Sequence, residues 1–183
     1  MTKEIQGSVS PSNPIAVGLG ELCVSNEPTV VMAAFALGSC VALCAYDLTA
    51  KVGGLAHIVL PNAPSFSRQS GEDSPGKYAD RALPEIVQRL EQLGARSERL
   101  VFKLVGGAAV LSGSGLLGST TGPLPGRLEV GRRNVQGVLS VLYRAGFFPT
   151  AADLGGPSGR TIYFWPTSGK MRVRTLRGEE REY

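Results

Sequence analysis

The chain has 183 residues, of which 43% are hydrophobic and 19% are charged, which is enough apolar material for the core of one domain of ordinary size. Its formal net charge of +4 is scattered, and without a clustered basic face or a known module we do not expect nucleic-acid binding. No apolar run reaches the roughly 20 residues that span a bilayer, and the N-terminus has no signal-peptide core, so we expect a cytoplasmic protein without membrane insertion.

Strand-like stretches dominate the first third of the chain. Strands are predicted, after a polar and flexible N-terminal segment at 1–14, over residues 15–24, 29–36, 40–47 and 53–61. The stretch at 40–47 is apolar on both faces, which predicts a strand that is buried on both sides. A polar loop at 62–76 follows, and loops of this length are usually functional or mobile.

The remainder of the chain mixes helices with strands. Apolar residues at helical spacing predict a first helix over 77–95, ended by Gly94, in which Pro84 indicates a kink or a later start. The other predicted segments are a strand at 99–110, a flexible low-complexity stretch at 111–127, a helix at 131–146, strands at 147–156, 160–166 and 170–176, and a charged tail at 177–183. This order predicts a single α/β (α+β) sandwich domain over 15–176, with mixed β-sheets packed against two main helices.

One thiol and the only imidazole stand out as candidates for chemistry. Cys40 follows Gly38 and Ser39 at the start of a predicted buried strand, and His57 lies on the next predicted strand. Strands joined by a short turn usually pair and lie about 5 Å apart, so the two side chains can meet. An imidazole beside a thiol favours the thiolate and can later protonate a leaving amine, which is the chemistry of a cysteine hydrolase.

Both residues also have a purely structural interpretation. Free cysteine is usually an inert core residue, an interpretation that suits Cys23 and Cys44, and a lone histidine on an apolar strand is more often a satisfied core residue than a catalyst. The odd number of three cysteines favours reduced thiols over a disulfide framework. Cys40 and His57 lie one hairpin apart, and together they make a stronger case for the chemical interpretation than either residue makes alone.

The residues before Cys40 are candidates for support of such a site. Gly38 permits a close backbone approach, and the N–H of Cys40, with a second donor from the turn that contains Ser39, is a candidate for stabilising an oxyanion. The chain has no CxxC pair and no HxxxH pattern, so we expect no metal and no cofactor. The glycine pairs at 106–107 and 155–156 lack phosphate-loop patterns and predict turns where backbones approach closely.

Several blocks of the sequence together resemble a known family. "LGSCVALCAYD" (37–47), "KVGGLAHIVLP" (51–61), "KLVGGAAV" (103–110), "VGRRNVQGVLSVLYRAGF" (130–147) and "AADLGGPSGRTIYFWP" (151–166) follow one another as in the chemoreceptor glutamine deamidase CheD family. The resemblance extends from about residue 15 to residue 176. It implies an α/β sandwich similar to toxin deamidases, and hydrolysis of selected glutamine side chains, sometimes also glutamyl methyl esters, on methyl-accepting chemotaxis receptors.

The resemblance also implies residue roles and partners. The family's nucleophilic cysteine and basic histidine correspond to Cys40 and His57, and some members bind the phosphatase CheC. The family's third catalytic residue, a threonine six residues before the cysteine, is replaced here by Ala34. Two hypotheses follow: a deamidase that tunes chemotactic adaptation, or a weakly active or non-catalytic module that binds receptors or a CheC-like phosphatase. A cysteine hydrolase of another substrate class is a third.

Overall fold

A computed structural model of the chain describes the following residues: 11, 13–64, 74–109 and 125–183. Three segments that the sequence predicts to be irregular therefore lie wholly or largely outside the described residues, namely 1–14, 62–76 and 111–127.

Ten strands among the described residues form two five-stranded sheets. One sheet, called the outer sheet here, has the order β1 (Ile15–Ala16), β3 (Met32–Leu37), β8 (Arg160–Trp165), β9 (Lys170–Thr175) and β10 (Glu180–Glu182). The other, called the central sheet, has the order β2 (Leu22–Ser25), β5 (Val52–Ile58), β4 (Val41–Asp47), β6 (Val101–Gly106) and β7 (Pro149–Leu154). Both sheets are mixed, because β1 pairs with β3 and β6 with β7 in parallel.

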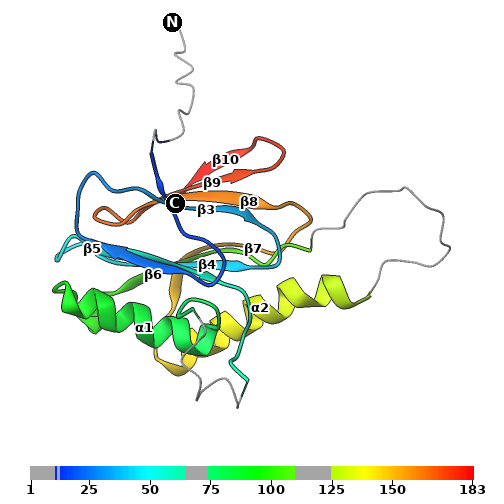
Figure 1. Ribbon diagram of the computed structural model, residues 1–183, viewed down its shortest axis with the longest axis horizontal. Coiled ribbons are helices and arrows are strands. Elements are labelled where there is room, and N and C mark those ends of the chain that lie inside the picture. The colour runs from blue at the N-terminus through cyan, green and yellow to red at the C-terminus, as the bar shows by residue number, and fades with distance from the viewer. Residues whose placement is uncertain (1–10, 12, 65–73, 110–124) are drawn as a thin grey trace, which may run out of the picture.

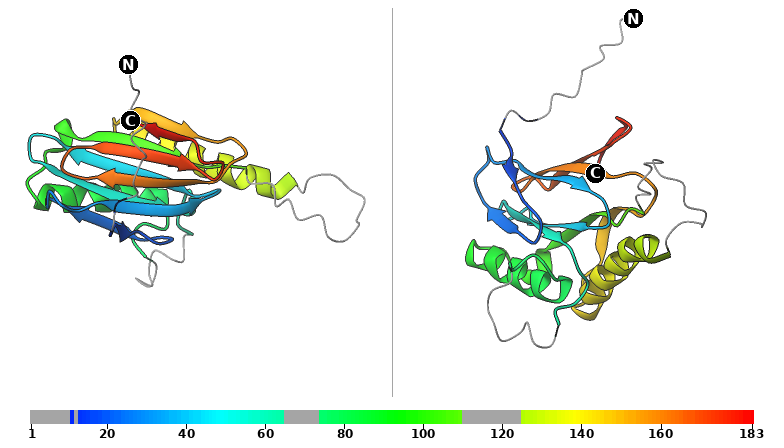
Figure 2. Two further views of the ribbon diagram at one scale, coloured as in Figure 1. Left: turned by 90° about the horizontal axis from the view of Figure 1, so that it is seen from above. Right: turned by 45° about the vertical axis from the view of Figure 1, so that its right-hand side comes forward.

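The molecule has three layers, which confirms the predicted sandwich (Figure 1). The outer sheet lies on one face of the central sheet, and helices α1 (Ala79–Gln92) and α2 (Pro125–Arg144) lie together on the other (Figures 1 and 2). One apolar cluster fills the space between the two sheets, and a second joins the central sheet to the helices. Since both faces of the central sheet are covered, every residue of β4 and β5 is buried, as the apolar stretch at 40–47 predicts.

The predicted strand at 15–24 is wrong as a single element. Residues 15–16 form β1 in the outer sheet, whereas residues 22–25 form β2 in the central sheet. Between them, residues 17–21 cross from one sheet to the other, and Gly20 there adopts a φ of 76°, in the left-handed region that glycine tolerates. The alternating pattern of two short strands on either side of this crossing resembles that of one longer strand.

Both predicted helices are present, with differences at their starts. α1 begins at Ala79, so Pro84 lies inside it and does not delay it, and Gly94 follows its end with a φ of 96° as predicted. α2 begins at Pro125, six residues before the predicted start at 131, and proline is favoured at the first helical position. Neither described helix is long and apolar enough to cross a membrane. The charged segment at 177–183 contributes β10, which pairs with β9.

A buried carboxylate joins two turns at the end of β4. One oxygen of Asp47 accepts the N–H groups of Thr49 and Ala50 at 2.9 and 3.1 Å, and the other accepts Arg96 N–H at 3.1 Å and Arg99 Nε at 2.9 Å. Burial alone would raise the pKa of Asp47, but these hydrogen bonds, led by the one from Arg99, outweigh it and lower the pKa from 3.8 to about 2. The ionised carboxylate therefore stabilises the fold.

We expect Asp47→Asn to lower the free energy of unfolding at pH 7 by about 2 kcal/mol. The contribution of the carboxylate is fully present above pH 3.8 and is lost as the pH falls toward 2, because the unfolded chain takes up the proton first. Urea unfolding at pH 7 and pH 3 measures both effects, with Glu85→Gln, which removes an exposed pair with Arg89, as the control. Equal losses of stability between the two pH values in the native protein and Asp47→Asn would contradict the assignment.

Candidate functional site

The His57 ring has one nitrogen bound and one nitrogen free. Nδ1 lies 3.0 Å from the carbonyl oxygen of Val17. A carbonyl only accepts hydrogen bonds, so Nδ1 carries the ring proton and donates it, and Nε2 is left with its lone pair. Nε2 is buried and has no hydrogen-bond partner among the described residues. Burial lowers the pKa of His57 below 6.5, against smaller opposing effects of the Val17 carbonyl and Glu21, so the ring is neutral at pH 7.

The crossing at 17–21 holds the backbone of His57 as well as its ring. His57 N–H donates to the Glu21 carbonyl at 2.9 Å, and Gly20 N–H donates to the His57 carbonyl at 3.0 Å. The crossing is closed by its own hydrogen bonds, in which Gly18 N–H donates to the Glu21 carboxylate at 2.7 Å. The segment that links the two sheets is thus also the support for the imidazole.

Cys40 lies where the chain passes from the outer sheet to the central sheet, directly before β4. Strands β4 and β5 pair in antiparallel register with Ala42 opposite His57, as predicted for the two segments, but Cys40 itself lies just outside the strand that was predicted to begin with it. Cys40 precedes Ala42 by two residues, lies just beyond the end of the β4–β5 ladder and packs against the apolar cluster between the sheets. The thiol and the His57 ring are not hydrogen-bonded to one another, because Nε2 has no partner among the described residues. The thiol is partly exposed, and burial raises its pKa.

Hydrogen bonds fix the segment 38–40 that carries the thiol. Its three carbonyl oxygens accept, in chain order, Ala108 N–H at 2.7 Å, Asn134 Nδ2 at 2.9 Å and Gly107 N–H at 2.7 Å. The N–H groups of its last two residues have no hydrogen-bond partner in the described part of the chain. Gly38 and Ser39 therefore hold the segment through their carbonyl groups, and no described residue engages the N–H groups of Ser39 and Cys40.

The glycine pair at 106–107 forms the close-packed turn that the sequence predicts. Gly106 and Gly107 have φ values of 122° and 66°, and a Cβ atom on either would overlap the Cys40 carbonyl or the Val135 side chain, respectively. Gly155 N–H donates to the Gly106 carbonyl at 2.8 Å, which attaches the second glycine pair to the first. The backbones of three segments, 38–40, 106–109 and 155–156, are thus hydrogen-bonded to one another with no side chain between them.

Ala34 occupies the position where the family resemblance implies threonine. It is fully buried in β3 opposite Ile162, and the neighbouring Ala33 carbonyl accepts Val17 N–H at 2.8 Å. Position 34 is therefore next to Val17 in the outer sheet. A hydroxyl is absent there, but the Val17 carbonyl already binds the ring nitrogen that needs an acceptor.

Two parts of the site, Val17 and Asn134, were not predicted from the sequence. Val17 acts through a backbone carbonyl, for which no side-chain pattern exists. Asn134 does leave a signal, because it lies four residues before Val138 and eight before Leu142, both buried on the apolar face of α2. A polar amide on such a face, in a helix interior where asparagine is disfavoured, indicates a specific buried contact.

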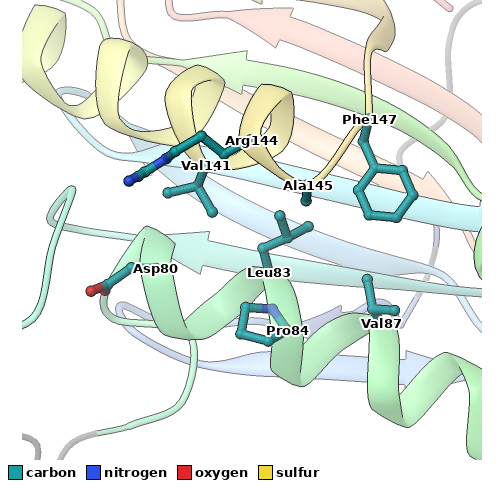
Figure 3. A pocket seen from close by; sticks show the side chains of 8 residues that line it. All are labelled: Asp80, Leu83, Pro84, Val87, Val141, Arg144, Ala145 and Phe147. Carbon is teal, nitrogen blue, oxygen red and sulfur yellow. The ribbon is translucent and has the colours of Figure 1, made fainter.

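A separate groove lies between the two helices (Figure 3). It has a volume of about 530 Å³, an apolar floor that includes Leu83, Val87 and Phe147, and the charged groups of Asp80 and Arg144 near one end (Figure 3). Cys40 and His57 do not line it. The groove contains no nucleophile and no imidazole, so it does not provide the chemistry that these two residues provide.

The fold and the site together define an α+β sandwich protein with a cysteine directly before one strand of its central sheet and a neutral histidine on the neighbouring strand. The family model described as CheD chemotactic sensory transduction matches residues 59–175. The chain belongs to the CheD family.

Curated relatives are similar along most of the chain. The protein named probable chemoreceptor glutamine deamidase CheD of Desulfitobacterium hafniense strain DCB-2 is 39% identical over 170 residues, which cover 93% of this chain and 98% of that protein. The chemoreceptor glutamine deamidase CheD of Thermotoga maritima is 37% identical over 164 residues, covering 90% and 93%. The probable deamidase of Methanococcus vannielii is 38% identical over 160 residues, covering 87% and 94%.

Proposed function

We propose that this protein hydrolyses the side-chain amide of glutamine residues on chemoreceptors, with Cys40 as the nucleophile and His57 as the base. The names of the relatives support the substrate and the reaction class. The observation that carries the assignment to residues is the bare Nε2 of a ring whose Nδ1 is bound, on the strand next to Cys40. A neutral imidazole with a free lone pair is the form that can take a proton from a thiol.

The first half of the reaction releases ammonia. As Cys40 Sγ attacks the carbon of the substrate amide, the thiol proton passes to Nε2 of His57, and the carbonyl oxygen becomes an oxyanion. The N–H groups of Ser39 and Cys40, which have no partner among the described residues, are the donors that we assign to this oxyanion. The imidazolium then gives its proton to the amide nitrogen, the C–N bond breaks, and ammonia leaves a thioester on Cys40.

The second half regenerates the enzyme. Water attacks the thioester carbon while Nε2 of His57 accepts one of its protons. The C–S bond breaks, the sulfur recovers the proton from the imidazolium, and the product is a glutamate side chain. Each turnover therefore converts one amide and one water into one carboxylic acid and one ammonia.

The product explains the proposed biological role. A glutamate in place of glutamine adds a negative charge to the receptor, and its carboxyl group can be esterified by a methyltransferase. We propose that this change tunes chemotactic adaptation in the cytoplasm. Hydrolysis of a glutamyl methyl ester would use the same attack with methanol as the leaving group, and a CheC-like phosphatase is a second proposed partner.

The alternative of a weak or non-catalytic module rests on the absence of a hydroxyl at position 34. In a cysteine–histidine site, the third group has the task of accepting the proton of the far ring nitrogen, which fixes the tautomer and the ring orientation. The Val17 carbonyl is within hydrogen-bond distance of that nitrogen. This contact favours an active enzyme, because the task of the missing threonine is one that a backbone oxygen can perform.

Incubation with a receptor cytoplasmic fragment tests the proposed function. We expect ammonia release and conversion of specific glutamines to glutamates, identified by peptide mass spectrometry, to be abolished in Cys40→Ala. His57→Asn should reduce the rate by about a hundredfold or more. Cys44→Ala is the matched control, because this buried cysteine lies on the strand that directly follows Cys40 and belongs to the same apolar cluster but is outside the proposed mechanism. Receptor binding without deamidation by the native protein would instead favour a binding module.

A second variant tests the substitute for threonine. We expect Ala34→Thr not to raise kcat by more than about twofold, because the ring nitrogen already has an acceptor and position 34 is fully buried. Steady-state kinetics on the receptor fragment provide the measurement, and circular dichroism verifies that the variant is folded. A rise of about tenfold or more would show that the Val17 carbonyl orients the ring poorly and that the hydroxyl is limiting.

A further inference from the structure

A single side-chain amide on α2 connects the residue before Cys40 with the segment that follows His57. Nδ2 of Asn134 donates to the carbonyl of Ser39 at 2.9 Å and to the carbonyl of Val59 at 2.8 Å. Ser39 directly precedes Cys40, and Val59 comes two residues after His57. Asn134 itself is 1% exposed. The amide therefore bridges the nucleophile segment and the end of the strand that carries the base.

The bridge lies where the hydrogen-bonded ladder of the sheet stops. The pairing of β4 with β5 ends with Val41 opposite Ile58, one residue short of Cys40 and Val59. Val59 N–H does not continue the ladder but donates to the Lys77 carbonyl at 3.0 Å. The ladder therefore does not set the separation between Cys40 and β5. The two hydrogen bonds from Asn134 take its place at this position.

The orientation of the amide follows from its partners. Both partners are carbonyl oxygens, so the nitrogen must face them, and the opposite orientation would place an oxygen against two acceptors. Oδ1 then has no partner, and among the described residues it and Nε2 of His57 are the two buried side-chain polar atoms without a hydrogen bond. A buried oxygen without a hydrogen bond destabilises the fold, so part of what the two hydrogen bonds of Nδ2 contribute to stability is offset by Oδ1.

Close packing on both sides prevents the amide from shifting. Gly131, about one turn before Asn134, lies so near the loop at 107–108 that a Cβ atom there would be 2.6 Å from the Gly107 carbonyl oxygen. Gly137, about one turn after it, would carry a Cβ atom that overlaps Pro61. The backbone of α2 thus rests directly on the two loops that flank the site. Small movements of the helix are transmitted to both loops, because interiors packed this closely do not yield.

We propose that Asn134 is a positioning residue that sets the separation and orientation of the Cys40 thiol and Nε2 of His57. It touches neither the substrate nor the reacting atoms, and its effect passes through the carbonyl groups of Ser39 and Val59. This inference rests on the proposed function for its catalytic consequence. The geometric part concerns the thiol and the ring and can be tested without a receptor.

The kinetic test compares Asn134→Ala with Val138→Ala. Val138 lies one turn further on the same buried face and packs in the apolar core, and its side chain has no hydrogen-bond donor, so its truncation destabilises the helix packing but leaves the bridge. We expect Asn134→Ala to lower kcat about a hundredfold with KM within about twofold, because a small misalignment of reacting groups costs this much. Val138→Ala should retain nearly all of kcat. Equal losses of kcat in the two variants would overturn the proposal.

The second test measures the reaction of Cys40 with iodoacetamide between pH 6 and pH 10, followed by mass spectrometry of the peptide that contains it. In the native protein, His57 assists the loss of the thiol proton, so Asn134→Ala should slow alkylation severalfold at pH 7 to 8. In a His57→Asn background, Asn134→Ala should have no further effect, since the residue acts through the ring. Equal slowing in both backgrounds would overturn the proposal.

This second test separates the inference from the proposed function. If the native protein deamidates no receptor fragment, the proposed function fails, whereas the alkylation cycle still decides the role of Asn134. Should Asn134→Ala not fold, Asn134→Ser, which retains a single donor, replaces it in the same comparisons. Loss of the dependence on His57 in that variant supports the positioning role, and an unchanged dependence contradicts it.

Discussion

The hydrogen bond between Nδ1 of His57 and the Val17 carbonyl is the constraint on which the proposed chemistry depends. It fixes where the ring proton lies and so leaves Nε2 free to act as a base. The two partners belong to different parts of the sandwich, because Val17 continues from the outer sheet and His57 lies in the central sheet. The contact between the crossing and the central sheet is therefore what fixes the imidazole.

Burial of the pair determines its resting state. Burial raises the pKa of the Cys40 thiol and lowers the pKa of the His57 ring, so both groups are neutral near pH 7. A neutral pair differs from the thiolate–imidazolium pair of many cysteine enzymes, since in the proposed mechanism the charges form only when the substrate carbon is attacked. The backbone donors assigned to the oxyanion in that proposal are already in place before the attack, which is the arrangement in which such donors are most effective. A thiol at rest in this state is also less reactive toward oxidants than a thiolate.

The sequence allowed the layers, the two helices and most of the strands to be predicted, because these depend on local patterns. The stretch at 40–47 is apolar throughout and forms a strand buried on both faces, and Gly94 ends α1 where a glycine is needed. The crossing at 17–21 was not predicted, since its short flanking strands alternate like one longer strand. Its sheet assignment depends on partners far along the chain, which local patterns do not contain.

The same distinction applies to the site. The spacing of Cys40 and His57 was enough to predict that the strand after Cys40 pairs with the strand that carries His57, because the hairpin between them is local. The contacts of Val17 and Asn134 are not local. The ring contact spans 40 residues, and the two contacts of Asn134 span 95 and 75 residues. A carbonyl acceptor has no residue type, so Val17 could not be recognised, whereas the misplaced amide on the apolar face of α2 was visible but had no evident partner.

The most direct test of this account is nitrogen NMR of the ring, which the presence of a single histidine in the chain makes unambiguous. In protein labelled with ¹⁵N-histidine, long-range proton–nitrogen spectra at neutral pH report which nitrogen carries the proton. The account predicts a protonated Nδ1, a bare Nε2, and a ring that becomes doubly protonated only below its usual pKa of 6.5. A proton on Nε2 with a bare Nδ1, or a doubly protonated ring at pH 7, would contradict it.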